Sequence, residues 1–172
     1  MKKFFLFIII PFFIACSDDD SDNNSASQEN VLIIGGEEYP LAKGVLQFWN
    51  APDGTANEYE CYLVFGDSSM PNNIFLSDSD DSYEGLVIDI GFISENPDGV
   101  GNFSGEDVGA EYDLTSGDGD ESFVTCGYDL STTQLSVSKS GNNYSVEFNS
   151  IDENGSVVEV HFNGGISVVD AN

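Results

Sequence analysis

The chain has 172 residues, 12% of them aromatic, and its 31 acidic residues against four basic ones give a formal charge of −27. So acidic a protein repels phosphate backbones, because nucleic-acid binding depends on Lys and Arg displacing counterions. Nucleic acid is therefore excluded as a partner, and so is electrostatic attraction to anionic lipid headgroups.

Residues 1–15 predict a secretory signal peptide. Lys2 and Lys3 precede a run from Phe4 to Ile14 that carries no charge. This run is too short to cross the ~30 Å hydrocarbon core of a membrane as a stable helix. We expect the segment to be removed, and the loss of both lysines makes the mature chain two charges more negative.

The end of this run, Phe13-Ile14-Ala15-Cys16, resembles the lipobox of bacterial lipoproteins. In that motif the cysteine sulfur receives a diacylglyceryl group, and the cysteine becomes the new N-terminus. The resemblance implies that Cys16 is lipidated and that acyl chains such as palmitate hold the protein at the membrane, each buried methylene contributing ~0.8 kcal/mol. The alternative is an ordinary signal peptide that ends in a chance cysteine.

The next four residues, Ser17, Asp18, Asp19 and Asp20, resemble the acidic export signal that follows the lipidated cysteine in many Bacteroidetes-type surface lipoproteins. This resemblance implies a lipid-anchored protein of the outer membrane, exposed at the cell surface. The alternative is a solvated tether, since runs of like charge stay extended. Residues 16–30 contain no aromatic side chain, and we expect them to form a disordered acidic tether.

Residues 31–172 have the usual size of one domain. Apolar and polar side chains alternate in the segments 59–65, 88–92 and 144–149. A period of two residues predicts strands with one buried face.

Turn sequences separate these segments, at Ala51-Pro52-Asp53-Gly54, Ser140-Gly141-Asn142-Asn143 and Asp152-Glu153-Asn154-Gly155. Such clusters are typical of β-hairpins. No segment outside the signal peptide has the apolar period of a helix, so we expect almost no helix in the mature domain. The fold predicted is all-β: an antiparallel β-sandwich of about nine strands, or the same strands closed into a small up-and-down, lipocalin-like barrel.

Two aromatic residues are candidates for ligand binding. Gln47 and Trp49 share one face of a predicted strand, and Leu46 and Phe48 share the other. If Trp49 and Tyr62 stand on an exposed face, they form a surface that stacks against a sugar ring; the alternative is that both fill the core.

Cys61 and Cys126 remain once Cys16 is lipidated. Both lie in predicted strands, and an exported protein permits a disulfide between them, which would stabilise the fold by about 4 kcal/mol in the chain-entropy model. Two buried free thiols are the alternative.

Aspartates at alternate positions suggest a calcium site formed by Asp78, Asp80, Asp118 and Asp120, because Ca²⁺ takes six to eight oxygen ligands. The segment that begins at Asp78 does not match an EF-hand loop, since Tyr83 occupies the position where the sharp turn requires Gly. In so acidic a chain, Asp-rich loops also arise from composition alone.

The single histidine, His161, shares strand parity with Glu159 and Asn163, which predicts a place on a polar face. One histidine and two cysteines do not complete a usual zinc site, and no set of residues for nucleophilic catalysis converges. We therefore expect no enzymatic activity and no cofactor other than calcium.

The segments "IIGGEEYPLAKGVLQFW" (33–49) and "LSVSKSGNNYSVEFNSIDENGSVVEVHFNGGI" (135–166) resemble a diffuse group of small Bacteroidetes lipoproteins. The group shows a Gly-x-x-Tyr-x-Leu opening, which Gly36-Glu37-Glu38-Tyr39-Pro40-Leu41 matches in spacing, and a closing glycine, here Gly164. The resemblance implies a compact β domain at the cell surface and transfers no catalytic residue.

Together these features predict a lipid-anchored envelope protein whose β domain binds a partner or has a structural role. The partner expected, besides the membrane, is a glycan or another envelope protein. The alternative function is a small glycan hydrolase that uses a pair of carboxylates.

Overall fold

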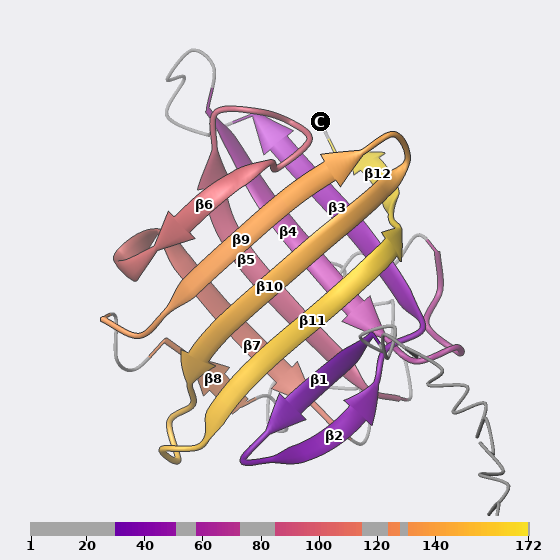
Figure 1. The fold of residues 1–172 in the computed structure, drawn as a ribbon. Helices are drawn as coiled ribbons and strands as arrows, with labels where there is room; N and C mark the ends of the chain where they lie inside the picture. The colour runs from indigo at the N-terminus through magenta and orange to yellow at the C-terminus, as the bar shows by residue number, and fades with distance from the viewer. Residues whose placement is uncertain (1–29, 51–57, 73–84, 115–123, 128–130, 172) are drawn as a thin grey trace, which may run out of the picture.

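Two six-stranded β-sheets pack face to face in the described part of the chain (Figure 1). A computed structural model describes residues 30–50, 58–72, 85–114, 124–127 and 131–171. The sheet nearer the viewer in Figure 1, here the front sheet, has the strand order β2-β1-β11-β10-β9-β6, and the back sheet has the order β12-β3-β4-β5-β7-β8. The strands of the two sheets cross steeply, as in orthogonal sheet packing.

The front sheet consists of β1 (Val31–Ile34), β2 (Glu37–Pro40), β6 (Gly101–Ser104), β9 (Gln134–Ser140), β10 (Asn143–Ile151) and β11 (Val157–Gly165). The back sheet consists of β3 (Lys43–Asn50), β4 (Tyr59–Gly66), β5 (Val87–Ser94), β7 (Val108–Asp113), β8 (Val124–Cys126) and β12 (Ser167–Asp170). A 3-10 turn, η1 (Gly105–Asp107), is the one helical element among the described residues. The prediction of an all-β sandwich is confirmed, although with twelve described strands instead of about nine.

The barrel alternative is wrong, because the two sheets remain separate. Nine of the ten strand pairings are antiparallel, and the exception is β12, which runs parallel to β3 with Ser167 opposite Val45. Because β11 ends at Gly165 and β12 begins at Ser167, the chain passes from the front sheet to the back sheet at Ile166.

The core lies between the sheets, where the alternation predicted it. Every second residue of β5 and β10 is buried, and so are Cys61, Leu63 and Phe65 of β4. Aromatic pairs join the two sheets: the ring centroids of Phe65 and Phe162 are 4.7 Å apart, and those of Phe92 and Phe103 are 4.6 Å apart. At one end the buried Tyr112 hydroxyl of β7 donates a 2.8 Å hydrogen bond to Asp152, which follows β10.

Two of the three predicted hairpin turns lie in the described residues, and both are confirmed. Gly141 and Asn142 connect β9 to β10, and the positive φ of +61° at Gly141 suits glycine. Residues 152–156 connect β10 to β11. The turn predicted at 51–54 lies outside the described residues.

One end of the outer face of the back sheet is covered. Val45, Val64 and Val87 project from this face and form a second apolar cluster with the buried Met70. The Lys43 ammonium donates a 2.6 Å hydrogen bond to the Met70 carbonyl. Gly66 lies beneath, where a Cβ atom would approach the Met70 Sδ to 2.7 Å. The opposite end of the same face is open.

Candidate functional site

A hollow of about 510 Å³ lies at the open end of the back sheet's outer face. Its floor contains Gly91 of β5 and Gly109 of β7, which are direct cross-strand partners. Outward side chains are therefore missing at two adjacent positions of the sheet. A Cβ atom at Gly109 would meet no atom within 4 Å, so this part of the floor is open space. We call the site the glycine hollow and define it by Tyr62, Asp89, Gly91, Gly109 and Glu111.

Tyr62 of β4 forms an aromatic wall beside this floor. It is the cross-strand partner of Gly91, and a Cβ atom at Gly91 would lie 3.1 Å from the tyrosine ring. Trp49 contacts the same ring edge to face, with centroids 5.4 Å apart and planes at 89°. The Tyr62 hydroxyl donates a 2.6 Å hydrogen bond to Glu60. Burial, this hydrogen bond and the charges of Glu60 and Asp89 raise the pKa of the Tyr62 phenol, which therefore stays neutral.

A pair of carboxyl groups forms a neighbouring wall. Asp89 of β5 and Glu111 of β7 are cross-strand partners. Each lies two residues from the glycine on its own strand and therefore projects from the same face of the sheet. Asp89 is half-buried, and its Oδ1 atom is buried and has no hydrogen-bond partner. Burial first, and then the negative charge of Glu111, raise the pKa of Asp89 to about 7. The hollow thus holds a carboxyl group that exchanges its proton near neutral pH.

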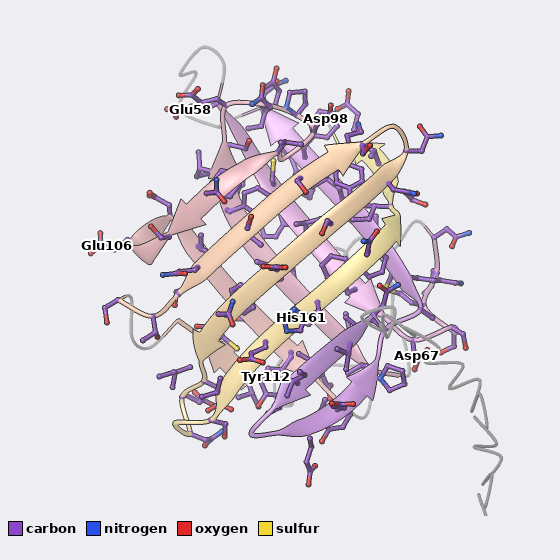
Figure 2. All side chains as sticks on the ribbon, in the orientation of Figure 1. Glu58, Asp67, Asp98, Glu106, Tyr112 and His161 are labelled. Atoms are coloured by element: carbon purple, nitrogen blue, oxygen red, sulfur yellow. The ribbon has the colours of Figure 1, made fainter. Side chains whose placement is uncertain are left out.

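Further carboxylates stand around the hollow. Glu60 lines it from β4, and Glu106 and Asp107 of η1 line it from the turn before β7. Figure 2 shows Glu106 projecting at the outer margin of the molecule. None of the lining residues that the structure describes is basic.

The structure brings Trp49 and Tyr62 together, as the predicted aromatic surface requires. Both are partly exposed on the outer face of the back sheet. Their binding of a ligand stays a prediction.

The predicted disulfide is wrong, because Cys61 and Cys126 are both free and buried. Each faces the core as its parity predicted, but β5 and β7 lie between β4 and β8. Three strand spacings of ~4.8 Å separate the two cysteines by about 14 Å, whereas disulfide-bonded Cα atoms lie about 4.4–6.8 Å apart. Burial raises the pKa of each thiol to about 12.

His161 lies on the outer face of the front sheet, in agreement with its parity (Figure 2). Its Nε2 atom is 3.8 Å from Glu159, and its Nδ1 atom is buried without a hydrogen-bond partner. The glycine hollow is on the other sheet, so this imidazole is not part of it.

Several predicted sites lie outside the described residues: the lipidated Cys16, the export signal Ser17–Asp20 and the calcium ligands Asp78, Asp80, Asp118 and Asp120. Within residues 30–50, 58–72, 85–114, 124–127 and 131–171, no three His, Cys, Asp or Glu side chains are grouped to hold a metal. The same described ranges contain no helix with the length and hydropathy of a membrane span.

Sequence reasoning missed Asp89, Glu111 and the two glycines. A signal for two of them was present in the strand segment Ile88-Asp89-Ile90-Gly91-Phe92. A glycine inside a strand often marks a close approach of another group to the backbone. The pairing of Gly91 with Gly109 depends on which strands are neighbours, and the alternation pattern does not contain that information.

Comparison with models of known protein families, with curated proteins and with solved structures gave no match to this chain.

Proposed function

We propose that this protein is a lipid-anchored lipoprotein of the outer cell surface whose β domain binds a glycan in the glycine hollow, without turning it over. The observation that supports the site is the pairing of Gly91 with Gly109 beside Tyr62. This arrangement leaves a space of about 510 Å³, within the range of ~300–1,000 Å³ typical of ligand pockets.

The chemistry of the walls supports a sugar. The ring of Tyr62 offers a flat apolar surface against which a sugar ring packs. Asp89 and Glu111 are acceptors for hydroxyl groups: Glu111 is exposed, whereas the Oδ1 atom of Asp89 is buried without a partner, and an unsatisfied buried acceptor favours a ligand that donates to it. A few polar groups that converge beside an aromatic wall are the usual composition of a small-ligand site.

Filling the floor tests the site. We expect Gly109→Val to abolish binding on a glycan array while leaving the fold intact, because its Cβ enters empty space and valine favours strands. The protein used is the chain from residue 16 onward with Cys16→Ser, so that it carries no lipid. Gly165→Val is the matched control, since Gly165 lies on the front sheet and a Cβ there also meets nothing within 4 Å. Array binding that survives Gly109→Val would place the ligand elsewhere.

The anchor has its own test. In cells, Cys16→Ser removes the acceptor of the acyl chains, so we expect the protein in the soluble fraction or as an unprocessed precursor. Replacement of Asp18, Asp19 and Asp20 by Ala leaves lipidation intact but lowers surface exposure, measured by protease shaving of intact cells. If the Cys16→Ser protein stays in the membrane fraction, Cys16 is not the anchor. If protease shaving of the triple-alanine variant is unchanged, the aspartates are only a tether and not an export signal.

A second candidate function is hydrolysis of a glycosidic bond, which the Asp89–Glu111 pair favours. Asp89 and Glu111 are cross-strand partners on one face of the sheet, and glycosidases act through two carboxyl groups that face one cleft. A carboxyl group with a pKa of about 7 is suited to act as the general acid. Incubation with the glycans that bind, followed by measurement of new reducing ends, separates the two functions: product that disappears in Glu111→Gln while binding persists supports hydrolysis.

A further inference from the structure

The glycine hollow concentrates negative charge. Five carboxyl groups line it: Glu60, Asp89, Glu106, Asp107 and Glu111. Asp89 and Glu111 are close enough for the charge of Glu111 to disfavour the ionised form of Asp89. An anionic ligand would add to this repulsion, so the charge of the site restricts its ligand to neutral or cationic groups.

Among the residues that the structure describes, no lysine or arginine lines this site. The four basic residues of the chain are Lys2, Lys3, Lys43 and Lys139. The first two lie in the predicted signal peptide. Lys43 binds the Met70 carbonyl at the covered end of the sheet, and Lys139 forms a 2.8 Å ion pair with Asp98. Neither of these two lysines therefore offsets the charge of the carboxyl groups in the hollow, which leaves them open to a cationic ligand.

Asp89 supplies an observation independent of the charge count. Its Oδ1 atom is buried and accepts no hydrogen bond, although buried polar atoms are nearly always paired. Asp89 lines the hollow and is partly exposed as a residue, so the hollow adjoins its side chain. The Oδ1 atom of this carboxyl group lacks a hydrogen-bond donor, and the group lacks a positive charge nearby. An ammonium group provides both, because it carries three N–H donors and a positive charge.

The aromatic wall is also suited to a cation. The face of a tyrosine ring attracts a cation held within about 6 Å of its centroid. The Tyr62 ring lies over Gly91, and Asp89 follows as the next outward residue of β5. Carboxylates and an aromatic face thus adjoin one open space.

We infer that the glycan bound in the glycine hollow is an amino sugar, whose primary ammonium group donates hydrogen bonds to Asp89 and Glu111 while its ring packs against Tyr62. This inference rests on the proposed function and names its ligand class. A sugar-sized ring suits a hollow of about 510 Å³ better than a single ion does. Within the described residues, moreover, no group of three His, Cys, Asp or Glu side chains is arranged to hold a metal.

The test uses ring-shaped probes that differ in one group: trans-4-aminocyclohexanol, trans-cyclohexane-1,4-diol and trans-4-hydroxycyclohexanecarboxylate. Trp49 is the only tryptophan of the chain and contacts Tyr62, so its fluorescence reports binding. At ~0.15 M salt, which screens long-range attraction, we expect the amine to bind about tenfold more tightly than the diol, the factor that one charge-assisted hydrogen bond supplies. The carboxylate should not bind.

Two variants separate the site from general attraction to an acidic protein. Asp89→Asn should lower the affinity for the amine about tenfold. Glu38→Gln removes one charge from an exposed position of β2, on the front sheet, and should leave the affinity within about twofold.

The pH dependence gives a third readout. The ionisable groups nearest to Asp89 on the neighbouring strands are Glu111 of β7 and Tyr62 of β4, and Glu60 of β4 lines the hollow farther along. Since Asp89 ionises with a pKa of about 7 while an alkylamine stays protonated, affinity for the amine should rise roughly tenfold from pH 6 to pH 8. In Asp89→Asn this rise should be absent.

The outcomes distinguish the two levels of the proposal. If the amine and the diol bind with equal affinity, and Gly109→Val abolishes the binding of both, the ammonium inference is wrong and the proposed glycan site remains. A linear amine, 5-aminopentan-1-ol, that binds as tightly as the ring amine overturns the amino sugar in favour of a lysine-like ligand. If no probe changes the Trp49 fluorescence, the inference fails, and the glycan array then decides the proposed function by itself.

Discussion

Replacement of Asp89 by Asn should stabilise the protein, and increasingly so as the pH rises. Asp89 is a carboxyl group whose pKa is about 7 in the folded state, against a reference value of 3.8. Between these two values the folded state holds a proton that the unfolded state releases. Because the folded state binds more protons there, stability falls as the pH rises toward 7.

The magnitude follows from the pH interval. Each pH unit in this range changes the free energy of unfolding by ~1.4 kcal/mol. From pH 5 to pH 7 the ionisation of Asp89 therefore lowers wild-type stability by about 2 kcal/mol, because the slope halves as the pH reaches the pKa, and above pH 7 the effect levels off. Asparagine has nearly the same shape and no charge, so the variant escapes this loss.

Urea unfolding at pH 5, 6, 7 and 8 measures the effect, since urea, unlike guanidinium, leaves charge interactions unscreened. The difference in unfolding free energy between Asp89→Asn and wild type should grow by about 3 kcal/mol from pH 5 to pH 8. Glu38→Gln, which removes a carboxylate from an exposed strand, controls for net charge. A difference for Asp89→Asn that does not depend on pH would refute the raised pKa and, with it, the buried, proton-holding wall of the hollow.

Two further predictions concern the core. Tyr112→Phe removes the donor of the buried 2.8 Å hydrogen bond to Asp152 and should lower the free energy of unfolding by ~1–3 kcal/mol in urea; no change would mean that water replaces the hydroxyl. In the Cys16→Ser chain, thiol titration should find two reactive groups after unfolding without reductant and almost none at pH 8 before it, because burial raises the pKa of Cys61 and Cys126 to about 12. A single reactive thiol or none after unfolding would contradict the free cysteines.

The sequence pattern predicted the core and the hairpins because both depend on residues that are close together in the sequence. Alternation in the segments 59–65 and 144–149 requires only that one face be buried, and Tyr144, Val146 and Phe148 are buried accordingly. Turns such as Gly141-Asn142 are determined by their own residues. Strands of three or four residues, such as β2 and β6, contain too few alternations to be recognised, so the predicted strand number was too low.

The glycine hollow could not be predicted from the same pattern, because it depends on the pairing of strands that are far apart in the sequence. The alternation of Ile88 and Ile90 places Asp89 on the outer face, where a solvated carboxylate is the ordinary expectation. The cross-strand partners of Asp89 are Val64 on β4 and Glu111 on β7, which become its neighbours only through strand order and register. The disulfide prediction failed for the same reason: parity was right for both cysteines, but strand order separates them.

The two ends of the back sheet's outer face show that the hollow is not required by the fold. At one end, Val45, Val64, Val87 and Met70 bury this face in an apolar cluster. At the other end, the same strands carry two glycines, which are poor strand formers, and a carboxyl group that weakens the fold above pH 5. Valine at Gly109, where a Cβ atom meets nothing within 4 Å, and asparagine or an apolar residue at Asp89 would suit the sheet better. Features that lower stability without serving the packing are expected where a protein binds its ligand, and here they converge on a single open space beside Tyr62.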